Sequence, residues 1–103
     1  MQVIQYDPHA GQNFADIIGA SNTIVDFYAD WCGPCQAMTP TLNAFAEKHT
    51  DVQVLKVNID KHPELASQYG VRSIPTLLGF TGGEENGRTV GVTNQEGMAA
   101  LLA

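Results

Sequence analysis

The chain has 103 residues, with five lysines and arginines against eleven aspartates and glutamates and a formal net charge of −6. This length suits one domain, spanning residues 1–103, with its own hydrophobic core. The acidic balance argues against a nucleic-acid-binding surface, and no apolar stretch approaches the ~20 residues of a membrane span. The N-terminus has neither a basic nor an apolar signal region, so we expect a freely diffusing cytoplasmic protein.

Apolar strands and amphipathic helices alternate along the chain. Strands are expected at residues 2–6, 23–29, 51–59, 76–80 and 88–92. Helices are expected around residues 14–18, from about 34 to about 49, over 63–69 and from Thr93 to about 102. This order predicts an α/β fold in three layers, with a mainly parallel sheet and helices on both faces. The last two strands add an antiparallel edge.

Two local signals refine the C-terminal part. Thr93 and Glu96 have the capping-box spacing that opens a helix, and Met98, Leu101 and Leu102 then form its buried stripe. Residues 85–87 are unusually polar and turn-like, so we expect the fifth strand to start late or to bulge.

The only two cysteines, Cys32 and Cys35, stand where the second strand meets the long helix. At i and i+3 on a first helical turn they lie close enough to bridge. Free N–H groups and the helix dipole lower the pKa of a thiol there. We expect Cys32 to be the more exposed thiol, which attacks a target disulfide, and Cys35 to be the more buried thiol, which resolves the mixed disulfide.

The intervening residues suit the same site, and two other interpretations compete with it. Gly33 lets the backbone turn tightly, and Pro34 stiffens a helix start. A zinc half-site needs two more ligands, for which the chain offers three histidines without a second cysteine pair. A purely structural bridge over so short a loop constrains little.

The sequence Trp31-Cys32-Gly33-Pro34-Cys35 is similar to the active site of the thioredoxin family. Further matching segments are Val25-Asp26-Phe27-Tyr28-Ala29, Val57-Asn58-Ile59-Asp60, Val71-Arg72-Ser73-Ile74-Pro75-Thr76 and Val90-Gly91-Val92. The resemblance implies a thioredoxin fold, a central five-stranded mixed sheet flanked by four helices. It also implies a monomeric general protein-disulfide reductase without a bound cofactor or metal. Its partners are then disulfide-containing proteins and a thioredoxin reductase that supplies electrons from NADPH.

Asp26 and Lys56 acquire roles through this resemblance. A carboxylate in the middle of an apolar strand is costly to bury, so the residues alone leave a solvent-facing position equally open for Asp26. The resemblance places Asp26 beneath the cysteines, where burial raises its pKa and lets it exchange the proton of Cys35. Lys56 then lies nearby and favours the charged carboxylate, although an ordinary solvated lysine remains an alternative.

The resemblance also implies a surface for the target chain. Base rates favour a trans Ile74–Pro75 bond, whereas the family implies a cis bond packed against the disulfide. Target contacts are then expected at Trp31, Ile74, Pro75, Gly91 and Val92, while Gly33 and Pro34 set the redox poise. For Trp31, a core aromatic is the alternative.

Two departures from the family pattern stand out. Gln36 replaces a common lysine and removes a cation near the cysteines, and Tyr28 replaces a common tryptophan. Two alternative functions also stay open. One is an oxidant or isomerase of an oxidising compartment, which Gly33-Pro34 disfavours. The other is an accessory binding subunit in which redox activity is incidental.

Overall fold

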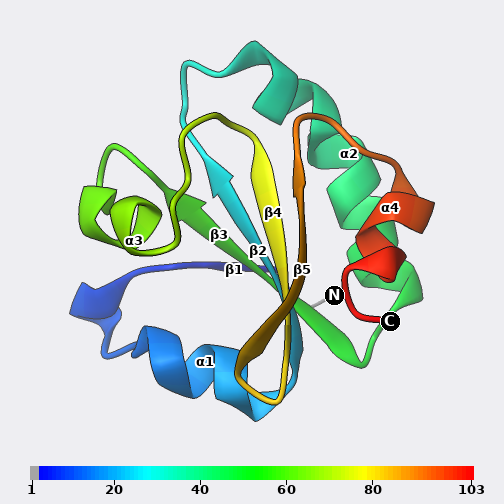
Figure 1. Ribbon diagram of the computed structural model, residues 1–103, viewed down its shortest axis with the longest axis horizontal. Helices are drawn as coiled ribbons and strands as arrows, with labels where there is room; N and C mark the ends of the chain where they lie inside the picture. Colours follow the sequence, from blue (N-terminus) through cyan, green and yellow to red (C-terminus); the bar gives the residue numbers. More distant parts are fainter. Residues whose placement is uncertain (1–2) are drawn as a thin grey trace.

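The computed structural model describes residues 3–103 and shows a five-stranded sheet between two layers of helices (Figure 1). The strands are β1 (Val3–Gln5), β2 (Asn22–Tyr28), β3 (Val52–Asn58), β4 (Thr76–Thr81) and β5 (Glu84–Val90). The helices are α1 (Phe14–Ala20), α2 (Gly33–Lys48), α3 (Pro63–Gln68) and α4 (Gln95–Ala100), with a 3-10 turn at Pro8–Ala10. The expected element order and three-layer arrangement are confirmed.

The sheet has the order β1-β3-β2-β4-β5 and is less parallel than expected. β3 pairs in parallel with β1 and β2, whereas β4 runs antiparallel to both β2 and β5. The connection after β3, residues 59–75 with α3, re-enters the sheet at the end where β3 finished, so β4 runs back beside β2. The alternation of side chains along a strand does not report the direction of that strand, which is why the sequence pattern did not predict this.

Side-chain alternation along β2 divides the core into two halves. Val25 and Phe27 pack with residues of α1 and α3, whereas Ile24 packs with residues of α2 and α4. Asp26 lies on the same side as Ile24, because residues two apart in a strand face one way. Asp26, the one charged residue of β2, therefore enters the interior on this second face.

β5 departs from the expected bounds. It begins at Glu84 rather than later, so the expected late start is wrong, but the expected bulge is confirmed. Gly79 pairs with Gly87 while Phe80 pairs with Glu85, which leaves Asn86 as the extra residue. The Asn86 amide donates to the carbonyls of Leu101 (3.0 Å) and Ala103 (2.8 Å). The polar segment therefore ties the bulge to the chain end after α4.

The expected capping box at Thr93 is wrong by one residue. Asn94 caps α4, and its side chain accepts the N–H of Gly97 at 2.9 Å. Gly97 lies so close to the Thr93 hydroxyl that a Cβ there would collide with it. An asparagine is as good a cap as threonine, so local preference did not separate the two positions. Met98 and Leu101 are buried as expected, whereas Leu102 of the expected stripe is only partly buried against the same cluster.

Within residues 3–103, none of the helices has both the length and the apolar character that crossing a bilayer requires.

Candidate active site

The two cysteines lie at the junction of β2 and α2. Cys32 is the N-cap of α2, and its sulfur accepts the backbone N–H of Cys35 at 3.1 Å. The Cys32 N–H in turn donates to the carbonyl of Ala29, which closes the turn after the strand. The two sulfurs form a disulfide across a Cα–Cα distance of 5.3 Å. The predicted bridge on the first turn of a helix is confirmed.

The expected difference in exposure between the two cysteines is absent in this disulfide form. Cys32 is 4% exposed and Cys35 is 7% exposed. Both belong to a small cluster with Ala29, against which Tyr28, Ile59 and Ile74 pack. The assignment of attacking and resolving sulfur therefore depends on the position of each sulfur relative to the helix end and to Asp26.

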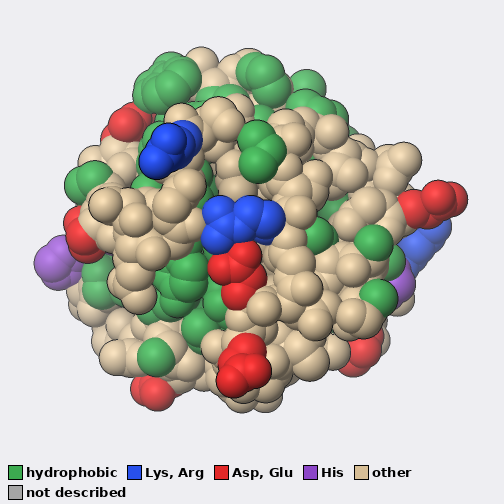
Figure 2. All heavy atoms as spheres, in the orientation of Figure 1, with side chains coloured by type: hydrophobic (Ala, Val, Ile, Leu, Met, Phe, Trp, Pro, Cys, Tyr) green, Lys and Arg blue, Asp and Glu red, His purple; other side chains and the backbone are tan. Residues whose placement is uncertain are grey.

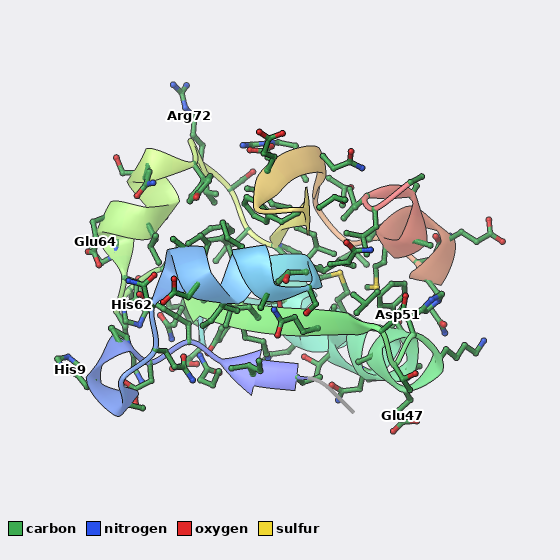
Figure 3. All side chains as sticks on the ribbon, turned by 90° about the horizontal axis from the view of Figure 1, so that it is seen from below. His9, Glu47, Asp51, His62, Glu64 and Arg72 are labelled. Carbon is green, nitrogen blue, oxygen red and sulfur yellow. A yellow bond between two sulfur atoms is a disulfide. The ribbon has the colours of Figure 1, made fainter. Side chains whose placement is uncertain are left out.

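The zinc interpretation lacks its further ligands in the part of the chain that the structure describes. No group of three or more histidine, cysteine, aspartate or glutamate side chains in residues 3–103 is arranged to hold a metal. His9 and His62 lie near the 3-10 turn and the start of α3 (Figure 3). Both cysteine sulfurs are engaged with each other.

Trp31 is exposed rather than part of the core. Its side chain is 69% exposed, and its indole N–H donates to Asp60 Oδ2 at 2.8 Å. The core-aromatic alternative is therefore wrong. Asp60, which the sequence analysis assigned no role, holds the indole in place beside Cys32. One of the segments that resemble the family ends at Asp60, but no neighbouring residue in the sequence indicated a contact between Asp60 and Trp31.

The Ile74–Pro75 peptide bond is cis, as the family resemblance implied. The Pro75 carbonyl accepts the N–H of Gly91 at 2.8 Å, and Gly91 has a φ of +92°, which residues other than glycine rarely adopt. Val92 next to it is 59% exposed. The loop before β4 and the end of β5 are thus joined beside the cysteines.

An apolar rim surrounds the disulfide at this end of the molecule. Exposed hydrophobic side chains of Trp31, Val90 and Val92 come from two segments of the chain, the turn before α2 and the end of β5. In Figure 2, hydrophobic atoms gather along the upper edge, over the loop that joins β2 to α2 in Figure 1. Isolated exposed apolar residues are normal, but a set that rims a reactive bond suits contact with another polypeptide.

Asp26 is buried below this rim. Its side chain is 4% exposed, so the solvent-facing alternative is wrong. Its Oδ1 atom is buried without a hydrogen-bond partner among the described residues. Burial raises the pKa of Asp26 from 3.8 to about 6, and the nearby Lys56 ammonium opposes this rise. A buried carboxyl that titrates near neutrality is suited to take up and release a proton.

A small polar cavity connects Asp26 with Cys35. Its volume is about 150 Å³, and Asp26, Cys35 and Lys56 are among its lining residues. Asp26 and Cys35 thus line one partly open space between β2 and the first turns of α2. At its border, the Gln36 amide donates to the Asp30 carbonyl at 2.7 Å. Gln36 stands where the family commonly has a lysine, so an uncharged hydrogen bond takes the place of a cation here.

Lys56 lies beside Asp26, as the resemblance implied. The two residues are register partners in the parallel pair of β2 and β3. The Lys56 side chain is half-buried, and its ammonium lies 4.5 Å from the centre of the Tyr28 ring, within the range of cation–π attraction. The sequence analysis interpreted Tyr28 only as a departure from the family pattern and missed this contact.

Comparison with known proteins gives a consistent result. The family model described as Thioredoxin matches residues 5–103. The thioredoxin of Chlamydia trachomatis is 45% identical over 92 residues, which cover 89% of this chain and 90% of that protein. The thioredoxin of Alicyclobacillus acidocaldarius is 47% identical, covering 88% and 89%. A solved thioredoxin of Nicotiana alata superposes with a TM-score of 0.85 at 32% identity, covering 96% of this chain and 88% of that one.

Proposed function

Because the chain belongs to the thioredoxin family of thiol–disulfide oxidoreductases, we propose that it is a general protein-disulfide reductase in which Cys32 attacks and Cys35 resolves. The observation that carries this proposal is the Cys32–Cys35 disulfide at the N-terminus of α2, above a buried carboxyl that titrates near neutrality.

The first step uses the reduced form. Cys32 caps α2, so its thiolate is stabilised by the N–H of Cys35 and by the helix dipole. It attacks one sulfur of the target disulfide, and the target S–S bond breaks as a mixed disulfide forms. The released target sulfur leaves with the electron pair and takes a proton from solvent.

The second step closes the ring. Asp26 shares a cavity with Cys35, and at pH 7 a carboxyl with a pKa of about 6 is mostly ionised. It accepts the Cys35 proton, and the resulting thiolate attacks the Cys32 sulfur. The mixed disulfide breaks, the second target sulfur leaves and is protonated, and the Cys32–Cys35 disulfide forms. The target has then gained two electrons and two protons.

The remaining parts of the proposal follow from this chemistry. Trp31, Ile74, Pro75, Gly91 and Val92 form the contact surface for the target chain, and Gly33 and Pro34 set the redox poise. A thioredoxin reductase that draws on NADPH returns the protein to the dithiol form. Such a reductase works in a reducing compartment, and we infer the cytoplasm. The exposed rim suits a monomer, because a partner copy seated there would block targets.

The decisive test is reduction of insulin disulfides, coupled to NADPH and a thioredoxin reductase. We expect Cys32→Ser to abolish turnover and Cys35→Ser to accumulate a mixed disulfide through Cys32. Mass spectrometry of the adduct identifies the attacking sulfur. If the Cys32→Ser variant traps the target on Cys35 and the Cys35→Ser variant traps none, the two roles are reversed. A wild-type protein that does not reduce insulin favours the accessory binding subunit instead.

A further inference from the structure

Three side chains from two neighbouring strands line the cavity beneath Cys35. Asp26 and Tyr28 are two residues apart on β2 and face the same side of the sheet. Lys56 on β3 is the register partner of Asp26, and Asn58 is the register partner of Tyr28. Lys56 therefore lies beside Asp26 and diagonally across from Tyr28, with all three side chains on the cavity side.

The aromatic ring of Tyr28 holds the lysine in this corner. The Lys56 ammonium lies 4.5 Å from the ring centre, well within the ~6 Å range of cation–π attraction. A lysine side chain has four rotatable bonds, and its ammonium tends to move out to water when nothing retains it. The ring face favours the conformation that keeps the ammonium near the carboxylate.

The other groups around Asp26 cannot replace this cation. Those that face the cavity from the neighbouring elements are Lys56 of β3, Asp30 of the loop after β2, and Cys35, Gln36 and Thr39 of α2. Leu77 of β4, the remaining register partner of Asp26, is apolar. Among these groups Lys56 is the one positive charge, and Asp30 is a second carboxylate. The charge state of Asp26 therefore depends on where the lysine ammonium stays.

We propose that Tyr28 is a positioning residue, whose ring holds the Lys56 ammonium at the cavity and thereby sets the pH range in which Asp26 accepts the proton of Cys35. The kinetic consequence rests on the proposed function, whereas the effect on Asp26 titration does not. Tyr28 also packs against the cysteine cluster, but in this role it acts through the Lys56 ammonium.

The test is the titration of the Asp26 carboxyl, followed by carbon-13 NMR in the oxidised full-length protein. Tyr28→Leu removes the ring and is expected to raise the Asp26 midpoint by about half a pH unit. Tyr28→Phe keeps the ring face and serves as the matched control, with a midpoint close to that of the wild type. Equal midpoints in the Leu variant and the wild type overturn the proposal.

A double-mutant cycle separates charge positioning from packing. In a Lys56→Met background, Tyr28→Leu is expected to leave the Asp26 midpoint unchanged, because no ammonium remains to be held. The same upward shift in that background shows that the ring acts by covering the carboxyl, which overturns the proposal. Tyr28→Trp is a second test, which remains informative even if the Leu variant does not fold. Its larger π face is expected to lower the midpoint, and a raised midpoint contradicts the proposal.

A kinetic arm links the inference to turnover. The rate of mixed-disulfide resolution between pH 5 and 8 is expected to shift with the NMR midpoint in each Tyr28 variant. A wild-type protein without insulin reduction refutes the proposed function and leaves the titration result standing. Normal turnover with an unshifted titration refutes the inference and leaves the proposed function standing. The two failures are therefore distinguishable.

Discussion

The two faces of the sheet are built on opposite principles, although β2 contributes to both. The face under α1 and α3 is closed by Val25 and Phe27 with a set of aromatic rings, in which Phe14 lies edge-on to Phe80 at 6.2 Å. The face under α2 is equally apolar in its middle, but at its active-site end Asp26, Lys56 and Tyr28 surround a polar cavity.

This difference separates stability from chemistry within one small chain. Close-packed aromatic rings contribute burial and contact energy without titratable groups. A buried carboxylate instead costs stability, because its charged form loses hydration. The cost is confined to one end of one face, so the opposite face is free to hold the fold together.

The largest effect is expected on the closed face. Phe27 is fully buried, and Phe27→Ala leaves a cavity that costs about 3–5 kcal/mol of unfolding free energy. Urea unfolding at pH 7 measures this loss. The folded fraction of the variant should still reduce insulin at a rate near that of the wild type, since Phe27 faces away from the cavity. A rate loss in fully folded variant protein breaks the separation between the two faces.

Asp26→Ala should raise the free energy of unfolding, which is the opposite of the effect of Phe27→Ala. The folded pKa of about 6 lies above the ordinary value of 3.8, so the folded state binds more protons between these pH values. Wild-type stability therefore falls as pH rises from about 4 through 6. The difference between the two pKa values corresponds to at most about 3 kcal/mol of unfolding free energy. The variant regains this free energy at pH 7. Disulfide reduction near neutrality should slow.

The pH dependence makes this prediction specific. Chemical unfolding at pH 3.5, where Asp26 is protonated in the folded state and mostly protonated in the unfolded state, should show little of this gain. Asp30→Ala removes an exposed carboxyl nearby and is the matched control, with a change within about 0.5 kcal/mol. A gain for Asp26→Ala that persists at pH 3.5 would mean that packing rather than charge burial is responsible.

A smaller effect should show that the α2–α4 face also contains purely structural polar contacts. Asn86→Ala removes the two hydrogen bonds from the β5 bulge to the carbonyls of Leu101 and Ala103. The expected loss is about 1 kcal/mol in thermal or urea unfolding. Insulin reduction and the Asp26 titration should stay at their wild-type values, and a shift in either shows coupling between the bulge and the cavity.

The smallest effect on stability is expected at the mouth of the cavity. Gln36→Lys replaces the neutral link to the Asp30 carbonyl with an exposed cation, and stability should change by less than about 0.5 kcal/mol. The added charge should favour the Cys32 thiolate in the reduced protein and speed its alkylation by iodoacetamide near neutral pH. Gln36→Ala is the control for loss of the link alone. Slower alkylation in the lysine variant contradicts the electrostatic argument.

Much of the fold was predictable because its signals are local. Alternation, helical spacing and Pro/Gly end signals located the five strands and four α-helices of residues 3–103, although not the 3-10 turn at Pro8–Ala10. Gly82 and Gly83 with positive φ form the turn that joins β4 to β5. The direction of β4 was not predictable in this way. It depends on the end of the sheet at which residues 59–75 return, which is a property of the assembled layers.

The functional site also has features that local sequence encodes and features that depend on the tertiary structure. The sequence by itself determined the reactive pair, since Cys32 and Cys35 need only a strand end and a helix start, both encoded by neighbouring residues. Only the tertiary structure decided that Trp31 is held by Asp60 and that Lys56 rests on Tyr28 beside Asp26. The physical reason is that the charge of a buried carboxyl depends on residues about thirty positions away, which strand pairing alone brings within reach.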